Sequence, residues 1–314
     1  MDSDHVPWAQ RPESRLLLIL SSERSGATLV RDTLGCHSRL VTPANLFLLR
    51  YLDYDAWRAQ QPAAIASLLE FFDLVGHPKS SEELDAMLAT REAAEVYRKL
   101  FDYMTAEGIL VDKTSAYGNE LSSLERSRPL LPFYLRILRH PLGVVDADLR
   151  GKDDEKRHRA AQAGLHRRLL APLTGAIRRI NGSREALMRK RESKWARQNQ
   201  NFRRFLGTVA PEQQLTIHFE DLVRDPKATV AAICRAMGLR EEPGLLAQHD
   251  RCAAAGPRSA VRDVVPRRSG AAIPAFEWSN RMSESWLMPH TLQLLKELGV
   301  RRLANVSVAS RRSA

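Results

Sequence analysis

A basic residue, two hydroxyls and a glycine follow one another in the stretch Arg24-Ser25-Gly26-Ala27-Thr28. Arginine offers a planar set of N–H donors to phosphate or sulfate oxygens, and glycine lets the backbone approach an anion closely. A helix that begins here would add unpaired N–H groups and the positive end of its dipole. The stretch therefore predicts a cradle for a phosphate or sulfate group.

The residues on either side of this stretch have the patterns that such a cradle needs. The apolar run at residues 16–20 is short enough for a buried parallel strand, and apolar residues at helical spacing follow at 29–34. The Walker pattern GxxxxGK[ST] is absent, because no lysine follows Gly26. The alternative is an ordinary strand-to-helix turn with a solvent-facing Arg24.

Three further segments read as strands that end in charged residues. They cover residues 108–111, 133–138 and 214–219, and they lead into Asp112-Lys113, Arg139-His140 and Glu220-Asp221. Ligands of open parallel sheets bind beyond the carboxyl ends of the strands, so these clusters should meet at one rim. The expected fold class is α/β, with a P-loop-like central parallel sheet of four to five strands, flanking helices and a helical cap.

Helical periodicity extends over residues 63–74, 81–89 and 91–104, and again over 153–180 and 183–206. Residues 151–206 are expected to form a basic helical cap over the rim. Within residues 151–194, 13 Lys and Arg against 5 Asp and Glu supply +8 of the chain's net charge of +11. This charge predicts docking of an acidic acceptor or carrier; the alternative is a solvated helical face. Nucleic-acid binding is not expected, because the segment is poor in aromatic residues.

The composition of the 314 residues indicates a single α/β domain over 14–314 behind a flexible arm at 1–13. The polar, acidic start of the chain is unlike a signal peptide. The three cysteines, Cys36, Cys234 and Cys252, are odd in number and lack CxxC spacing, which argues against disulfides or a metal site and for a reducing cytoplasm. We expect Cys36 and Cys234 to be small core residues. No apolar run reaches the ~20 residues that a membrane span needs.

Four segments of the chain together resemble a known family. Residues 21–40, 111–114, 135–150 and 215–225 are similar, in the same order, to the motifs of sulfotransferases that use 3′-phosphoadenosine 5′-phosphosulfate (PAPS). The four motifs resemble most those of the sulfotransferase domains of bacterial polyketide synthases, and tyrosylprotein sulfotransferases are more distant. The resemblance extends, with gaps, over roughly residues 15–239 and is specific as an ordered set.

The resemblance implies a role for each matching position. Residues 24–28 would bind the phosphosulfate, with Arg24 touching the group that moves. Lys113 matches the lysine that meets the leaving phosphate, and Arg139 matches the arginine that holds the 3′-phosphate. Phe219 stands where many relatives have tyrosine and would pack near the adenine. PAPS would be the sulfuryl donor, and no metal ion would be needed.

Two departures from the family concern the donor. In the family a serine shares the 3′-phosphate, and here that position is Ala147; Arg150, about one helical turn further, could compensate. In the late loop, expected over residues 253–275, Arg268-Ser269 matches an Arg-Ser step that closes over the phosphosulfate in tyrosylprotein sulfotransferases. That match assigns Arg268 to the donor and Ser269 to catalysis.

The general base is missing from its expected places. Relatives have a glutamate just after the first helix, where this chain has Pro43-Ala44-Asn45, and the histidine of the polyketide-synthase relatives is replaced by residues 264–266, Val-Val-Pro. An amide cannot accept a proton at neutral pH. The remaining candidates are His37, His140, His218 and Glu277.

The prediction is a sulfotransferase that moves the sulfuryl group of PAPS to a hydroxyl of a small-molecule or carrier-bound acceptor. One alternative is a protein of the same fold that binds the nucleotide but has lost its base, as Asn45 and Ala147 suggest. A P-loop kinase acting on a small molecule is the third reading, and the missing Walker lysine argues against it.

Overall fold

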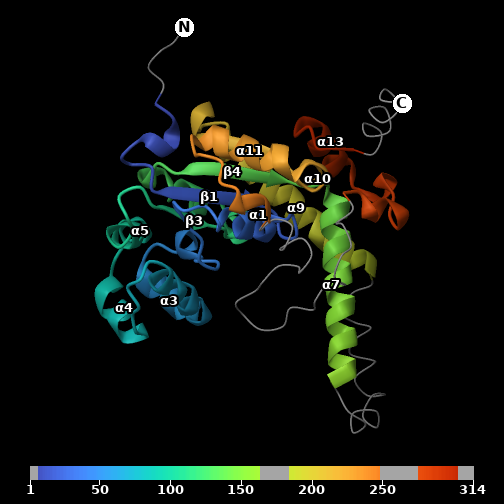
Figure 1. The fold of residues 1–314 in the computed structure, drawn as a ribbon. Coiled ribbons are helices and arrows are strands. Elements are labelled where there is room, and N and C mark those ends of the chain that lie inside the picture. The colour runs from blue at the N-terminus through green and yellow to red at the C-terminus, as the bar shows by residue number, and fades with distance from the viewer. Residues whose placement is uncertain (1–5, 163–183, 248–274, 303–314) are drawn as a thin grey trace.

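The computed structural model describes residues 6–162, 184–247 and 275–302 (Figure 1). Its centre is a five-stranded sheet in the order β2-β3-β1-β4-β5, in which all neighbouring strands are parallel. The strands are β1 (Leu16–Ser21), β2 (Leu40–Val41), β3 (Ile109–Asp112), β4 (Phe133–Leu138) and β5 (Gln214–His218). The predicted α/β class with a central parallel sheet is confirmed.

Four strands agree with the sequence prediction to within one residue at each end, and β2 was not predicted. Residues 16–21 are all buried, as expected for a strand with neighbours on both sides and helices on both faces. β2 has only two residues, Leu40 and Val41, and pairs with β3 at the edge of the sheet. A strand this short leaves no periodic pattern in the sequence.

Helices cover both faces of the sheet, with α11 above it and α3 and α4 below it in Figure 1. The α-helices are α1 (Ala27–Leu34), α2 (Tyr54–Gln60), α3 (Ile65–Leu74), α4 (Ser81–Leu88), α5 (Ala93–Asp102), α6 (Leu121–Glu125), α7 (Pro141–Gln162), α9 (Arg184–Leu206), α10 (Phe219–Arg224), α11 (Pro226–Met237) and α13 (Pro289–Glu297). Short 3-10 helices connect them: η1 (Trp8–Gln10), η2 (Leu48–Arg50), η3 (Pro62–Ala64), η4 (Ser115–Asn119), η5 (Arg128–Leu130), η7 (Pro211–Gln213), η8 (Glu277–Asn280) and η9 (Glu284–Trp286).

Alternate side chains of β1 enter two different cores. Leu16, Leu18 and Leu20 join the core formed with α2 to α6 and the end of α9. Leu17 and Ile19 join the core formed with η1, α1, α10 and α11. A third core, around Trp195 and Trp278, packs α7, α9 and α13 together beyond β4. This third core carries the helices that cover the carboxyl ends of the strands.

The described part of the cap begins earlier in the sequence than predicted. α7 starts at Pro141, directly after β4, and extends to Gln162, whereas a helix was expected from residue 153. Proline fits the first turn of a helix because its missing N–H has no partner to lose there. α9 (Arg184–Leu206) agrees with the expected helix over 183–206. Residues 163–183 lie outside the described residues.

The expected flexible arm is docked over its described part, residues 6–13. Trp8 in η1 is 2% exposed and its ring centroid lies 5.5 Å from that of Phe133. Burial of one indole removes enough apolar surface from water to hold a short segment against the sheet. Residues 1–5 lie outside the described residues.

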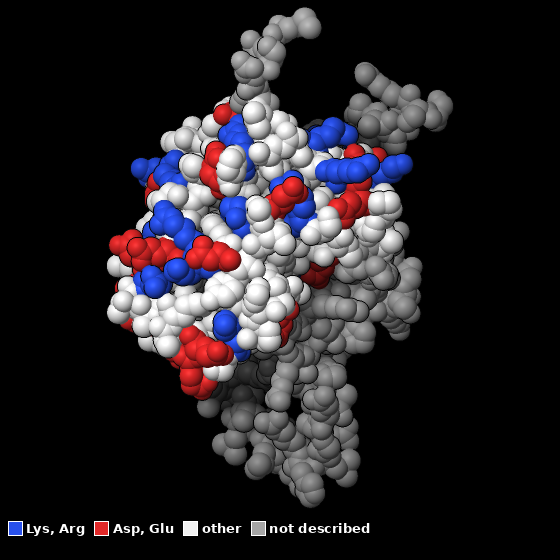
Figure 2. Space-filling model, turned by 60° about the vertical axis from the view of Figure 1, so that its left-hand side comes forward, with Lys and Arg blue, Asp and Glu red and all other residues white. Residues whose placement is uncertain are grey.

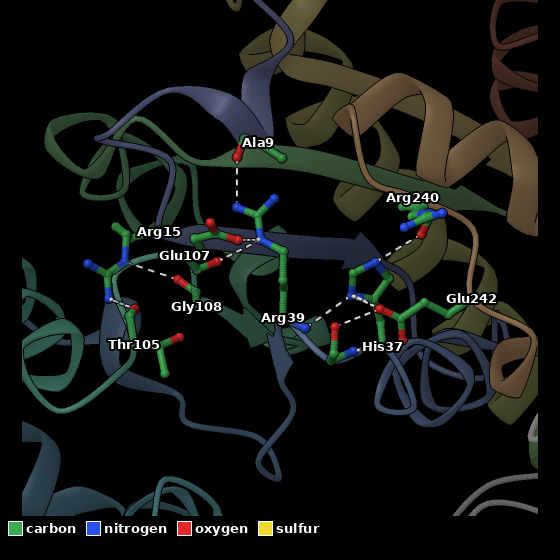
Figure 3. A network of polar contacts seen from close by, with 10 residues as sticks. Ala9, Arg15, His37, Arg39, Thr105, Glu107, Gly108, Arg240 and Glu242 are labelled. Atoms are coloured by element: carbon green, nitrogen blue, oxygen red, sulfur yellow. Dashed lines mark hydrogen bonds and ion pairs between the residues drawn. The ribbon is translucent and has the colours of Figure 1, made fainter.

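Two arginines close loops at the edge where the strands begin, opposite the rim (Figure 3). Arg15 donates from Nε to the carbonyl of Gly108 at 3.0 Å, and Arg39 donates from Nη2 to the carbonyl of Ala9 at 2.7 Å. These bonds satisfy backbone oxygens that the sheet ladder leaves free. The network holds the N-terminal segment, β2 and β3 together at the end of the sheet that lies away from the rim.

One cysteine prediction is wrong. Cys36 lies in the turn after α1 and is exposed, whereas Cys234 in α11 is fully buried in the core as expected. α1 ends at Leu34 and Gly35 follows it, so Cys36 lies beyond the helix and outside the core.

The contact between η4 and α9 leads to a stability prediction. A Cβ at Gly118 would lie 2.4 Å from the ring of Phe202, which is buried in the core. Gly118→Ala should therefore overpack this contact and lower the free energy of unfolding by about 1–3 kcal/mol, measured by urea denaturation. In the control Gly244→Ala the new methyl would meet only Cβ and the carbonyl oxygen of Cys36, both at 3.9 Å, so stability should not fall. Equal stability of the two variants would contradict the packing described here.

Candidate functional site

The structure brings the predicted charged clusters to one rim, because all strands run parallel. Ser21 of β1 lies opposite Ile137 of β4, and Leu138 of β4 lies opposite His218 of β5, so these three strands end at the same level. β3 ends beside β1 at Asp112. The residues that follow the strand ends are Arg24 and its loop, Lys113, Arg139 and Phe219.

The loop after β1 has the geometry of an anion cradle. Arg24 and Gly26 have φ angles of 62° and 87°, so the backbone turns twice through the left-handed region around Ser25. Gly26 then caps α1, and the hydroxyls of Ser22 and Ser25 are 2.7 Å apart. Thr28, in the first turn, is partly exposed. The arrangement presents the N-terminus of an eight-residue helix and its hydroxyls to the rim.

Arg139 connects this loop to β4 and β5. It donates from Nη1 to the carbonyl of Arg24 at 2.6 Å, and its guanidinium lies 3.9 Å from the centre of the Phe219 ring. A Cβ at Gly26 would lie 2.5 Å from the same ring, and a Cβ at Gly143 would lie 2.9 Å from Arg139 Nε. Two glycines therefore make room for the stacked arginine and phenylalanine. With Phe219 3% exposed, its ring mainly supports Arg139 and the loop.

Lys113 is a buried cation at the end of β3. Its residue is 9% exposed, and burial, with the charge of Arg31 second, lowers its pKa to about 8. The carboxyl of the preceding residue, Asp112, faces away into a buried cluster and accepts from the hydroxyls of Tyr97 and Tyr117. No hydrogen bond or ion pair of the Lys113 ammonium occurs with the residues that the structure describes, so it is available to an anion.

An acidic residue lies within the cradle and is neutralised by α9. Glu23 accepts from Lys194 Nζ at 2.5 Å and from Arg191 Nη1 at 3.0 Å. Burial acts to raise the pKa of Glu23, but the Lys194 hydrogen bond and the two cations outweigh it and hold the pKa below its usual value. Two charges of the basic cap are therefore used inside the protein. An acidic residue inside an anion-binding loop is the sequence signal for such a pairing with cations from elsewhere in the chain.

The Arg24 guanidinium points towards α7 rather than lying free. Its Nε is 3.7 Å from the carboxylate of Asp148, and a Cβ at Gly151 would lie 3.3 Å from its Nη2. Asp148 also pairs with Arg191 at 2.8 Å. Half of the Arg24 side chain is exposed, so its guanidinium can reach an anion, and the long contact with Asp148 can be exchanged for that anion.

Other predicted donor contacts are differently placed. Arg150 is paired with Glu277 at 2.5 Å and with Asp146 at 3.1 Å, and its contact with a donor stays a prediction. Ala147 is partly exposed on the α7 face between Gly143 and Gly151. Arg268 and Ser269, with the whole expected loop 253–275 up to residue 274, lie outside the described residues, as do the basic residues of the cap at 163–183.

The charge of the remaining surface is mixed. On the face of the described residues that Figure 2 turns forward, Lys and Arg side chains lie interspersed with Asp and Glu. The positive excess of the chain is therefore not gathered on that face.

His37 is excluded as a general base by its position (Figure 3). It follows the far end of α1, about 12 Å of helix away from the cradle at ~1.5 Å per residue. There it bonds the carbonyl of Arg240 at 3.1 Å and accepts the N–H of Arg39. The sequence indicates that His37 follows a helix, but it does not indicate that this helix carries the residue to the end of the sheet opposite the rim.

Of the other three base candidates, His140 and Glu277 are held in structural contacts, whereas the ring Nδ1 of His218 has no hydrogen-bond partner among the described residues and lies at the end of β5, three strands away from β3. His140 is fully buried, stacks on Trp278 at 4.3 Å and bonds Glu284, and burial lowers its pKa. Burial also lowers the pKa of His218. Glu277 is in ion pairs with Arg150 and Arg281. None of the three presents a free proton acceptor next to Lys113.

A carboxylate from a distant helix reaches the segment that lacks one. Glu70 of α3 accepts the N–H of Ala44 at 2.8 Å, next to Asn45. Two residues further, the N–H of Phe47 donates to the hydroxyl of Thr114 at 3.2 Å, so the segment is tied to the residue after Lys113. The sequence offered no signal for Glu70, because it lies in an ordinary amphipathic helix.

Two absences concern the described residues. No group of three or more His, Cys, Asp or Glu side chains there is placed to hold a metal ion. No helix among them is both long and apolar enough to cross a membrane.

Comparison with known proteins finds similarity to sulfotransferases. A family model described as the sulfotransferase family (Sulfotransfer_3) matches residues 165–243. The sulfotransferase domain from the curacin biosynthetic pathway is 24% identical, with a TM-score of 0.66 over 92% of this chain and 98% of that one. The sulfotransferase domain from the Synechococcus PCC 7002 olefin synthase is 22% identical, with a TM-score of 0.67 over 95% and 100%.

No match to a curated protein sequence was found. The two structural likenesses, both below 25% identity, establish the fold. Together with the family model they confirm the resemblance to sulfotransferases, including those of polyketide-type pathways, that the sequence motifs predicted.

The lowered pKa of Lys113 predicts a pH-dependent anion affinity. The ammonium is charged below a pKa of about 8 and neutral above it, so affinity for inorganic sulfate should fall as pH rises through this value. Sulfate itself does not titrate in this range. Loss of one charged contact corresponds to roughly tenfold weaker binding, measurable by calorimetry between about pH 6.5 and 9.5. Lys113→Arg should keep its affinity throughout, and the exposed control Lys99→Arg should behave as the wild type. The same decline in Lys113→Arg would show that another group titrates.

Proposed function

We propose that this chain, which has a sulfotransferase fold, transfers the sulfuryl group of PAPS to a hydroxyl of an acceptor. The observation that carries the proposal is the cluster of cations at one rim: buried Arg139 stacked on Phe219, buried Lys113, and the N-terminus of α1 after Gly26. A nucleotide with two phosphates and a sulfuryl group needs several separate positive sites at fixed spacing.

Each part of the rim has a role in this proposal. Arg139 would bind the 3′-phosphate through its planar guanidinium, held in place by the Arg24 carbonyl. The N–H groups at the start of α1, with Ser25 and Thr28, would bind the phosphosulfate. These residues suit PAPS because they are donors and cations only, and PAPS would supply the activated sulfuryl group.

The transfer needs positive charge and a proton acceptor. The acceptor oxygen forms a new bond to sulfur while the bond between sulfur and the phosphate oxygen breaks, and the hydroxyl proton leaves to a base. Lys113 and Arg24 would neutralise the charge that develops on the leaving phosphate and the moving group. Arg24 would exchange Asp148 for the donor as it does so.

Glu70 is our candidate for the base. It is a carboxylate beside Asn45, and its contacts among the described residues include no cation, unlike Glu23, Asp148 and Glu277. A carboxylate without a bound cation keeps its capacity to accept a proton.

The structural neighbours support a proposal for the acceptor class. The two structures that share the fold come from the curacin pathway and from an olefin synthase. We infer by analogy that the acceptor hydroxyl lies on a chain carried by an acidic carrier protein, docked against the basic cap. Action in the cytoplasm is part of the same proposal.

Titration with nucleotides tests the function and separates it from the alternatives. The wild type should bind PAPS and its desulfated product and bind ATP much more weakly. Arg139→Ala should weaken PAPS by at least about tenfold, the value of one lost charge-assisted bond, whereas Arg24→Ala should lower kcat more than affinity. Arg235→Ala, at an exposed position, is the control. Tight ATP binding would favour the kinase reading, and unchanged PAPS affinity in Arg139→Ala would remove the donor assignment.

The base assignment has its own test. Glu70→Gln keeps the size of the side chain but cannot accept a proton, so kcat with a true acceptor should fall about 10²–10⁴-fold while PAPS affinity stays unchanged. Full activity in Glu70→Gln would leave this carboxylate a positioning group for Ala44. A protein that binds PAPS and sulfates no tested hydroxyl, even with Asn45→Glu, would be the impaired binding protein.

A further inference from the structure

A cavity of about 520 Å³ lies between α7, the first turns of α9 and the segment around η9. Cavities of about 300–1,000 Å³ are the size of small-molecule sites. A void of this size is therefore a candidate binding site.

The floor of the cavity is apolar and its mouth faces solvent. Leu142, Val145 and Leu287 are 1%, 2% and 6% exposed and form part of the core between α7 and α13. Met188 of α9 is partly buried beside them. Trp286 also lines the cavity and is 45% exposed, so one side of the cavity is open. Binding of an apolar ligand here would remove apolar surface of both the ligand and the cavity floor from water, which is favourable.

Arg189, Glu192 and Arg281 at the cavity are already paired, whereas Glu185, which also lines it, is exposed. Arg189 lies 3.1 Å from the carboxylate of Glu192 and donates to the carbonyl of Trp286 at 2.6 Å. Arg281 makes a two-point contact with Asp146, at 2.8 Å and 2.7 Å. Among the described lining residues both arginines thus have carboxylate partners, and an anion would have to break an existing pair. These charges disfavour an anion, and the apolar floor favours an uncharged ligand.

The cavity is separate from the proposed donor site, although the same two helices line both. On α7, Val144 and Asp148 face the loop, whereas Leu142 and Val145 face the cavity. On α9, Arg191 and Lys194 face the loop, whereas Arg189 and Glu192 line the cavity. At 100° per residue these sets lie on different helix faces. The cavity is behind the α7–α9 pair as seen from Glu23.

We propose that this cavity is a second binding site, which takes an uncharged, largely apolar small molecule. The proposal does not rest on the transfer reaction or on the identity of the donor. A ligand there would contact α9 one turn from the residues that neutralise Glu23, so its occupancy would be transmitted to the loop by the same helix.

Fluorescence tests the site directly. Of the five tryptophans, Trp286 alone is exposed, the others being 0–2% exposed. Nile red, a neutral apolar dye, should bind at one site, quench the Trp286 emission and be displaced by decanol. Trp286→Phe should remove the quenching signal. Inorganic sulfate should not displace the dye.

Two variants of equal chemistry separate the cavity from ordinary surface adhesion. Met188→Glu places an unpaired charge in the apolar floor and should weaken dye binding at least tenfold. Leu74→Glu makes the same change at a 54% exposed leucine at the end of α3 and should bind as the wild type. Thermal unfolding would show that both variants are folded.

Three results would overturn the proposal. Dye binding unchanged in Met188→Glu would place the dye elsewhere, and equal loss in both variants would indicate non-specific adhesion. Stronger displacement by decanoate than by decanol, which share one chain and differ in charge, would show that the site prefers an anion. Loss of PAPS binding with intact dye binding would concern only the proposed function.

Discussion

The neutralisation of Glu23 is the interaction on which the rim depends. A carboxylate in an anion cradle repels the ligand unless cations cancel it, and Lys194 and Arg191 do so from α9. Because this pairing draws α9 across the strand ends, the same helix donates from the Trp195 indole to the carbonyl of Arg139 at 3.0 Å. It also places Gln198 on the carbonyl of Ser115. The ion pairs of Glu23 and these two hydrogen bonds of α9 together link the loop with the ends of β3 and β4.

Burial of cations at the rim costs free energy in the folded protein, and an anion that binds there offsets this cost. Burial lowers the pKa of Lys113 to about 8, which means that the folded chain disfavours the charged ammonium. An anion brought to that position restores the charge and gains an interaction that water does not screen. Arg139 is held similarly, by a carbonyl and an aromatic ring. The rim is therefore arranged for a charge that arrives with the ligand.

Helices α7 and α9 have different partners on different faces. Their inner faces meet the loop through Asp148 and Arg191, and their outer faces enclose the cavity above Leu142 and Met188. A displacement of α9 by a ligand would move both the floor of the cavity and the cations at Glu23. The basic character of this region, which the sequence suggested was for an acidic partner, is in its described part largely spent on internal pairs.

Local pattern in the sequence determined the parallel sheet, four of its five strands and the loop at residues 24–28, because each of these features is encoded by residues near one another. The cations after the strand ends followed from the same rule, since parallel strands end at one edge. Only the tertiary structure decided that Glu23 meets Lys194, 171 residues away, that Glu70 reaches Ala44, and that His37 lies at the opposite edge. Each depends on how helices pack against the sheet, and that packing joins residues far apart in the chain which no local periodicity relates.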